Sequence, residues 1–219
     1  MNLFTISVIS SFSIGIAAIT GLVRHKRIDE SYQPFIVICW VSLLAETISL
    51  IFIYRFRNNA VPYNIYAITE AVLYVWLFKS WGEFENKPKT LISLVIFLGL
   101  VWVTDNFILN SFFSINPLFW IVYSFTLIFL SINQLNRILV TGRTSLLRDS
   151  RFLICMCIII FYSYTATIEV FYILKLNFSD FFYNRVYLVL EIVNFIVNLI
   201  FAAAVVWIPR RQKFILPFS

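Results

Sequence analysis

The chain has 219 residues, of which 61% are apolar and 13% are charged, with a formal net charge of +6. Soluble domains contain roughly 45–50% apolar residues, so the composition excludes a water-soluble enzyme. Aromatic residues make up 19% of the chain, and this excludes a disordered protein, because disordered segments are poor in aromatic side chains.

Seven apolar stretches are long enough to cross a bilayer, which takes about 20 mainly apolar residues per helix. They cover residues 3–23, 34–54, 60–78, 91–108, 117–135, 152–174 and 186–208. The loops between them are too short for a folded soluble domain, and no stretch alternates as the strands of a membrane β-barrel do. The sequence therefore predicts one all-α domain over residues 1–219, a polytopic membrane protein with seven unbroken transmembrane helices.

The basic residues predict the orientation, since cytoplasmic loops are enriched in Lys and Arg. Thirteen of the 17 Lys and Arg residues lie in the first, third and fifth loops and the C-terminal tail. The N-terminus is therefore expected outside and the C-terminus inside, with the bacterial cytoplasmic membrane as the expected location. Because topology accounts for the net charge, nucleic acid is not an expected partner.

The basic inner face has two interpretations. Residues 137–151 and the tail with Arg210, Arg211 and Lys213 could contact a cytoplasmic protein partner or anionic lipid headgroups. The alternative is that these charges only set the topology.

The third and seventh spans share a pattern that indicates an internal repeat. Each contains Tyr-x-x-x-Glu, as Tyr66 with Glu70 and Tyr187 with Glu191, followed by Val two residues on and an aromatic residue four residues on. We interpret this as a parallel 3+1+3 repeat, with halves 1–81 and 117–213 and a linker helix 91–108. The alternative is a chance likeness between apolar helices.

The 3+1+3 arrangement resembles the plan of the SWEET and PQ-loop transporters. Their Pro-Gln signature is absent, because the chain has the reverse order, Gln33-Pro34, and does not repeat it. The seventh span lacks the lysine of retinal proteins, and no span has the histidines of the seven-helix hydrolases related to ceramidases.

A looser resemblance is carried by Asn64-x-Tyr66-x-x-x-Glu70, which follows an Arg-Asn-Asn segment at 57–59. This pattern resembles uncharacterised small seven-helix bacterial integral membrane proteins. The resemblance covers the second and third spans and implies no known function.

Four spans carry one glutamate each, all in the outer half of the bilayer: Glu46, Glu70, Glu169 and Glu191. Asp105 lies near the outer end of the fourth span. Ionisable groups within a membrane are costly and are candidates for function. Since no span holds Lys or Arg, we expect some of these acids to be protonated at neutral pH.

Each glutamate lies in a stripe of polar residues at helical spacing, and lipid offers such a stripe no partner. The stripes are therefore expected to converge on a polar pocket that binds a small cationic ligand or a metal ion. The residues expected to line it are Glu46, Tyr66, Glu70, Glu169, Tyr187, Glu191 and Asn194. The alternative is that these groups only hydrogen-bond the helices to one another.

The cysteines and the histidine indicate no zinc site and no catalytic triad. Cys39, Cys155 and Cys157 lie within spans, where packing is the expected role, and His25 lies alone in a loop. No catalytic residue is predicted, and the sequence does not identify a cofactor.

Three residues near the inner ends of the spans are assigned no functional role. Trp81 is expected in the interfacial aromatic belt. Glu83 and Glu85 are expected to be solvated loop charges.

The function predicted first is an integral membrane binding or sensor-type protein that takes a cation or a small cationic or polar ligand. A small proton- or cation-coupled transporter is the alternative, because of the repeat and the titratable core. A membrane-embedded lipid enzyme comes third, because paired acids can serve as general acid and base.

Overall fold

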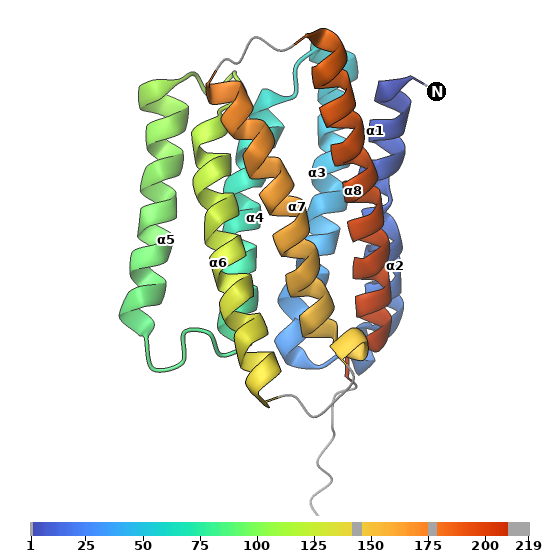
Figure 1. The fold of residues 1–219 in the computed structure, drawn as a ribbon, viewed down its shortest axis with the longest axis vertical. Coiled ribbons are helices and arrows are strands. Elements are labelled where there is room, and N and C mark those ends of the chain that lie inside the picture. The colour runs from blue at the N-terminus through green and yellow to red at the C-terminus, as the bar shows by residue number, and fades with distance from the viewer. Residues whose placement is uncertain (1, 142–145, 175–178, 210–219) are drawn as a thin grey trace, which may run out of the picture.

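The chain forms seven long helical spans in the computed structural model, which describes residues 2–141, 146–174 and 179–209 (Figure 1). Short 3₁₀ helices in the loops are η1 (His25–Arg27), η2 (Glu30–Tyr32) and η4 (Leu146–Arg148). The long helices are α1 (Leu3–Phe12), α2 (Ile14–Arg24), α3 (Gln33–Phe56), α4 (Ala60–Ser80), α5 (Pro88–Val103), α6 (Pro117–Thr141), α7 (Ser150–Ile173) and α8 (Asp180–Trp207). Helices α1 and α2 follow end to end as one span, and the all-α prediction is confirmed.

The ends of the helices carry residues that favour those ends. Helices α3 and α5 have a proline in the first turn, at Pro34 and Pro88, where no backbone hydrogen bond is lost. The side chain of Asp149 accepts a hydrogen bond of 3.0 Å from the backbone N–H of Phe152 and so caps α7. Arg57 ends α3 in the left-handed conformation, with φ of 57°.

Six of the spans form a ring in the order α1/α2, α3, α4, α6, α7 and α8, and α8 closes the ring against α1 and α2. Helix α5 lies outside the ring, against α4 and α6, at the left edge of Figure 1. Successive spans run in opposite directions, so the chain start and the end of α8 lie at opposite ends of the bundle. We call the upper end in Figure 1 the N-terminal end.

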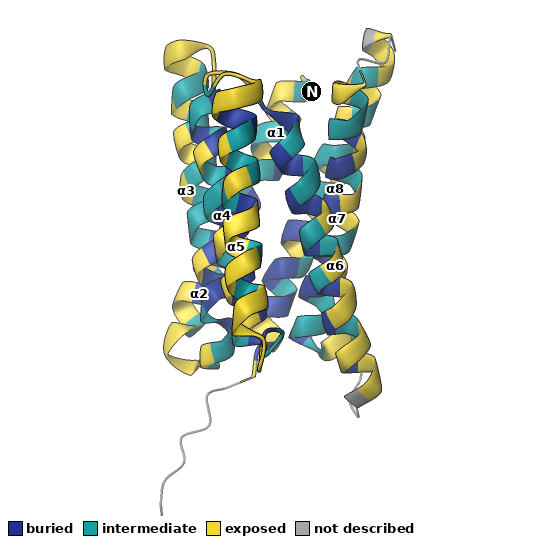
Figure 2. Ribbon diagram, turned by 90° about the vertical axis from the view of Figure 1, so that its left-hand side faces the viewer, coloured by how far each residue is buried: buried dark blue, intermediate teal, exposed yellow. Residues whose placement is uncertain are grey.

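Six of the described spans are long and apolar enough to cross a membrane. The exception is α4, which has 21 residues but carries Asn64, Glu70 and several tyrosines. Because α4 lies between α3, α5 and α6, much of its surface is covered by protein rather than lipid. Exposed residues follow the outer surface of the bundle, above all along α5 (Figure 2). The chain is therefore a multi-pass membrane protein, while its orientation, its repeat and its membrane of origin stay predictions.

The basic residues gather at the end opposite the N-terminal end, which we call the basic end. It holds Arg24, Lys26, Arg27, Lys79, Lys87, Lys89, Arg137, Arg148 and Arg151. The N-terminal end holds Arg55, Arg57 and Arg185. Outside the described residues lie Arg143, Lys175, Arg210, Arg211 and Lys213.

The first span is interrupted at Ser13, so the expectation of unbroken helices is wrong there. The N–H of Ser13 bonds to the carbonyl of Ser10 at 3.1 Å, a tighter turn than an α-helix has. The Ser13 hydroxyl donates to the same carbonyl at 2.5 Å, and the Asn198 amide of α8 donates to the Ser13 hydroxyl at 3.0 Å. These side-chain bonds offer the backbone an alternative to the regular helix.

The fourth span ends in a π-helix, η3 (Thr104–Leu109), which the sequence did not predict. The N–H of Asn110 reaches the carbonyl of Asp105 at 3.1 Å, five residues back. The Asn110 amide donates to the Asp105 carboxylate at 2.8 Å. The wider turn therefore places Asp105 for contacts outside its own helix.

Aromatic side chains meet across the ring near the basic end. Phe35 of α3 packs against Phe201 of α8 with ring centroids 5.1 Å apart. Tyr74 of α4 packs against Tyr162 of α7 with centroids 6.0 Å apart. Each pair packs across one intervening span of the ring, and together the two pairs close its interior towards the basic end.

Trp81 lies just below this closure and is only 3% exposed, so the prediction of an interfacial Trp81 is wrong. Its ring meets that of Tyr32 at 5.8 Å. The guanidinium of Arg151 lies over both rings, 5.5 Å from the Tyr32 centroid and 5.8 Å from the Trp81 centroid. Because α7 and η2 cover it, the indole packs inside the protein instead of facing headgroups.

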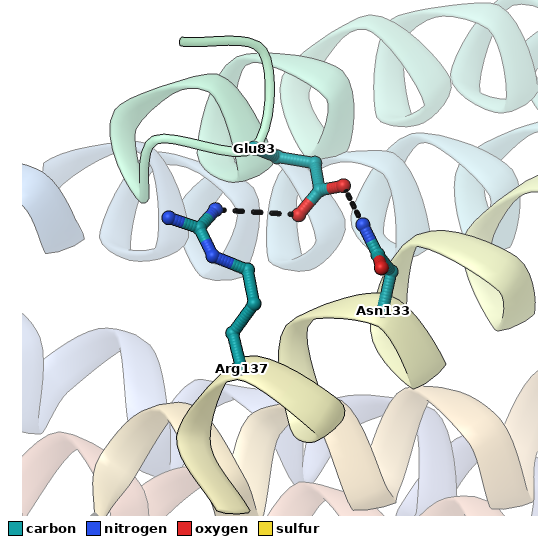
Figure 3. A network of polar contacts seen from close by, with 3 residues as sticks. All are labelled: Glu83, Asn133 and Arg137. Atoms are coloured by element: carbon teal, nitrogen blue, oxygen red, sulfur yellow. Dashed lines mark hydrogen bonds and ion pairs between the residues drawn. The ribbon is translucent and has the colours of Figure 1, made fainter. Parts of the chain in front are cut away.

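Glu83 is not a solvated loop charge, since its side chain is 7% exposed and lies 3.6 Å from the Arg137 guanidinium. The Asn133 amide donates to its other carboxylate oxygen (Figure 3). Gly82 has a φ of 83°, which glycine adopts at little cost, and this turn directs Glu83 towards α6. Glu85 is exposed, as expected.

Candidate functional site

A cavity of about 640 Å³ occupies the interior of the ring. All six spans of the ring contribute to its wall, and α5 does not. Lining residues nearest the N-terminal end, such as Phe4 and Tyr172, are exposed, whereas those nearest the basic end, such as Phe35 and Cys39, are buried. The cavity therefore opens towards the N-terminal end and is closed at its basic end.

The structure brings all seven residues of the expected pocket onto the wall of this cavity. They lie on α3, α4, α7 and α8 and are Glu46, Tyr66, Glu70, Glu169, Tyr187, Glu191 and Asn194. Their convergence follows from the polar stripes, because each stripe turns towards the one part of the bundle that lipid does not reach.

Glu70 on α4 is the most buried of the four glutamates, with 6% of its surface exposed. Tyr66, one turn earlier on the same helix, donates a hydrogen bond of 2.5 Å from its hydroxyl to Glu70 Oε1. The Tyr66 hydroxyl also lies 2.8 Å from the Ser42 hydroxyl of α3. Glu70 is thus oriented by neighbours and still reaches the cavity.

Two further tyrosines complete the surroundings of Glu70. The hydroxyls of Tyr123 on α6 and Tyr162 on α7 lie 2.9 Å apart, and both interact with the Glu70 carboxyl group. Hydroxyl groups from three helices therefore surround this acid.

Glu191 on α8 is oriented by the first span. The Ser7 hydroxyl donates to Glu191 Oε1 at 2.7 Å, and the Ser10 hydroxyl donates to the Glu191 backbone carbonyl at 2.7 Å. These bonds fix α1 against α8, and among the described residues the second carboxylate oxygen of Glu191 has no hydrogen-bond donor.

Glu46 on α3 interacts with groups on α1, α4 and α8. It interacts with Ser11 of α1, and it is close enough to Glu70 and Glu191 for mutual electrostatic repulsion. Three carboxyl groups from three helices therefore act on one volume. A cavity lined by several carboxyl groups favours a cationic ligand.

Glu169 and Asp105 have different positions. Glu169 lines the cavity and interacts with Asp105 and with Tyr187. Asp105 does not line the cavity and is 0% exposed. Its Oδ2 accepts a hydrogen bond of 2.8 Å from the backbone N–H of Phe119, so Asp105 caps the first turn of α6.

The expected pocket omitted the contribution of the first span. Ser7 and Ser11 line the cavity and contact its acids. Their spacing of i and i+4 in an apolar helix was a usable signal, because it puts two hydroxyls on one face. Trp120 of α6 also lines the wall, stacked on Tyr63 with ring centroids 4.6 Å apart, and no pattern in the sequence pointed to it.

No positive side chain of the described residues neutralises the cavity. None of the four glutamates forms an ion pair with a described Lys or Arg. Within residues 2–141, 146–174 and 179–209, no three His, Cys, Asp or Glu side chains are grouped closely enough to hold a metal ion. The arrangement is an electronegative cavity whose acids are spread over the wall.

Comparison with known proteins adds no relative: no family model, no curated protein and no solved structure matches the chain significantly.

Proposed function

We propose that this chain is an integral membrane protein that binds a cation, or a small cationic or polar ligand, in the cavity of the helix ring. The observation that carries the proposal is that four glutamates from four helices line one cavity, and none of them forms an ion pair with a described Lys or Arg. An acid at the centre of a span costs about 2.5–3.5 kcal/mol on insertion scales. A bound cation offsets that cost.

Access is proposed from the extracytoplasmic side. The cavity opens at the N-terminal end, and the basic residues gather at the other end. The distribution of Lys and Arg favours the basic end as cytoplasmic. A binding or sensor protein would then sample its ligand outside the cell membrane.

The test uses the charge preference of the cavity. Ser49 lines the wall, so Ser49→Cys is introduced in a variant whose Cys39, Cys155 and Cys157 are replaced by alanine. Impermeant trimethylammonium-ethyl and sulfonatoethyl methanethiosulfonates are added to intact cells, and the two modification rates are measured. We expect the cationic reagent to react at least about tenfold faster, because acid-lined clefts concentrate counter-ions.

Two controls define the result. Ser111→Cys, in an exposed loop at the same end, should show a much smaller charge preference. Adding Glu46→Gln, Glu70→Gln and Glu191→Gln should remove the preference at position 49, whereas Glu85→Gln at the basic end should not. Equal rates for both reagents at position 49 would contradict the proposal.

A proton- or cation-coupled transporter is the second candidate, supported by the order of the ring. With α5 outside, α4 lies beside α6 and α8 beside α1/α2, which is the order expected of two three-helix units related by a parallel repeat. Purified protein in liposomes would distinguish the two functions. Flux of a permeating amine that Glu70→Gln abolishes supports transport, and binding without flux supports a sensor.

A further inference from the structure

We infer that the ligand of this cavity is an organic ammonium ion with an aromatic or aliphatic part, and not a metal ion. The inference rests on the proposed function and names the class of ligand.

The size of the cavity favours an organic ligand. Its volume is about 640 Å³, within the roughly 300–1,000 Å³ of sites for small organic molecules. A metal ion with a few water molecules, each about 30 Å³ in the liquid, would leave most of this volume unused.

The spread of the acids disfavours a metal. Calcium takes six to eight oxygen ligands at about 2.3–2.6 Å, which requires side chains that meet at one point. In the described part of the chain no such group exists, and one oxygen each of Glu70 and Glu191 already accepts a hydrogen bond from Tyr66 or Ser7. A primary ammonium group has three N–H donors and needs no complete coordination shell, so the remaining carboxylate oxygens can serve as its acceptors.

The deep wall of the cavity is apolar and aromatic. Its residues below the glutamates, towards the basic end, are Phe35, Ile38, Tyr74, Ile158, Tyr162 and Phe201. Burial of an apolar group against this surface is favourable. A metal ion would gain nothing from burial against this surface, whereas an amine with an apolar part matches both regions.

The vertical order of the two regions sets how the ligand lies. Tyr74 is one turn further towards the basic end than Glu70 on α4, and the mouth is at the other end. The apolar part therefore enters first and rests on the aromatic floor, while the ammonium group stays beside Glu46, Glu70 and Glu191.

The experiment measures protection of the Ser49→Cys variant from the cationic thiol reagent by defined probes. These are phenethylammonium, methylammonium, sodium, magnesium and the neutral 2-phenylethanol. We expect phenethylammonium to protect at a concentration at least about tenfold below that of methylammonium, since a buried aromatic ring contributes more than 1.4 kcal/mol. The metal ions and the neutral alcohol should protect poorly.

A floor variant tests the apolar contact. Phe201→Leu should reduce the advantage of phenethylammonium over methylammonium several-fold. Phe195→Leu, which is on the same helix but does not line the cavity, should leave it unchanged. If Phe201→Leu does not fold, the probe series on the Ser49→Cys variant, in which Phe201 is kept, still tests the inference.

The outcomes separate the inference from the proposed function. Protection by sodium or magnesium at lower concentration than by phenethylammonium overturns the inference and leaves cation binding in place. Equal protection by 2-phenylethanol and phenethylammonium also overturns it, because charge then does not select the ligand. Loss of the charge preference in the labelling itself overturns the proposed function.

Discussion

The same spans form a hollow interior at one end of the helix ring and a closed, packed interior at the other. Towards the N-terminal end the ring is hollow, and glutamates, serines and tyrosines face the cavity. Towards the basic end the ring is closed by Phe35 against Phe201 and by Tyr74 against Tyr162. The difference teaches that the glutamates of these spans are placed by depth, at the level where the ring stays open. Substitutions at the two ends should therefore differ in kind.

The largest loss of stability is expected from Phe35→Ala. Phe35 is 0% exposed, and truncation of a buried phenylalanine costs about 3–5 kcal/mol. The free energy of unfolding in detergent, measured by denaturant titration, checks this value. Glu46→Ala, at the hollow end, should cost far less, and equal losses at the two positions would break the comparison.

A smaller loss is expected where α2 and α3 touch. A Cβ atom at Gly21 would lie 2.8 Å from the Ile36 side chain, so Gly21→Val overpacks the contact and should cost about 1–3 kcal/mol. Gly99→Val is the matched control, because no atom lies within 4 Å of a Cβ there. A melting temperature lowered equally by both variants would show that helix propensity, and not the contact, decides.

Asp105→Ala should separate a structural acid from the cavity acids. Loss of the cap on α6 should cost about 1–2 kcal/mol, seen as a lower melting temperature with the charge preference of cavity labelling kept. Glu191→Gln should do the reverse, with little change in stability and weaker labelling by the cationic reagent. If Asp105→Ala leaves the melting temperature unchanged, the capping role is wrong.

The smallest effect is expected at the C-terminus of α8. Arg24 donates to the carbonyl of Val205 at 2.5 Å and also to that of Val206, where a positive charge complements the helix dipole. Arg24→Gln should cost about 0.3–1 kcal/mol, which a precise thermal melt can detect. Lys26→Gln, an exposed neighbour, should have no measurable effect.

Most of the spans could be predicted from the sequence because their hydrophobic length sets them. The sixth span was expected at residues 152–174, and α7 covers Ser150–Ile173. The seven polar residues expected on the cavity wall could be predicted because an acid such as Glu191 has no hydrogen-bond partner in lipid and therefore turns towards the interior of the bundle. What such residues bind remains a proposal.

Features that depend on distant partners could not be predicted. The π-helix at Thr104–Leu109 accompanies the contact of Asp105 with Phe119. Burial of Glu83 depends on Arg137, which comes from another helix. Neither pairing leaves a periodic signal within its own segment.

Helix α5 sets the direction in which the last three spans cross the bilayer. Each crossing of the bilayer reverses the direction of the chain, so three spans leave it on the side opposite to the one where they began. A single further crossing by α5 returns it to the starting side, and α6, α7 and α8 then run in the same directions as α1/α2, α3 and α4. Without α5, the last three spans would run in the opposite directions, and Glu169 and Glu191 would lie towards the other end of the bundle from Glu46 and Glu70. A span that contributes nothing to the cavity wall thus determines that all four acids line one cavity.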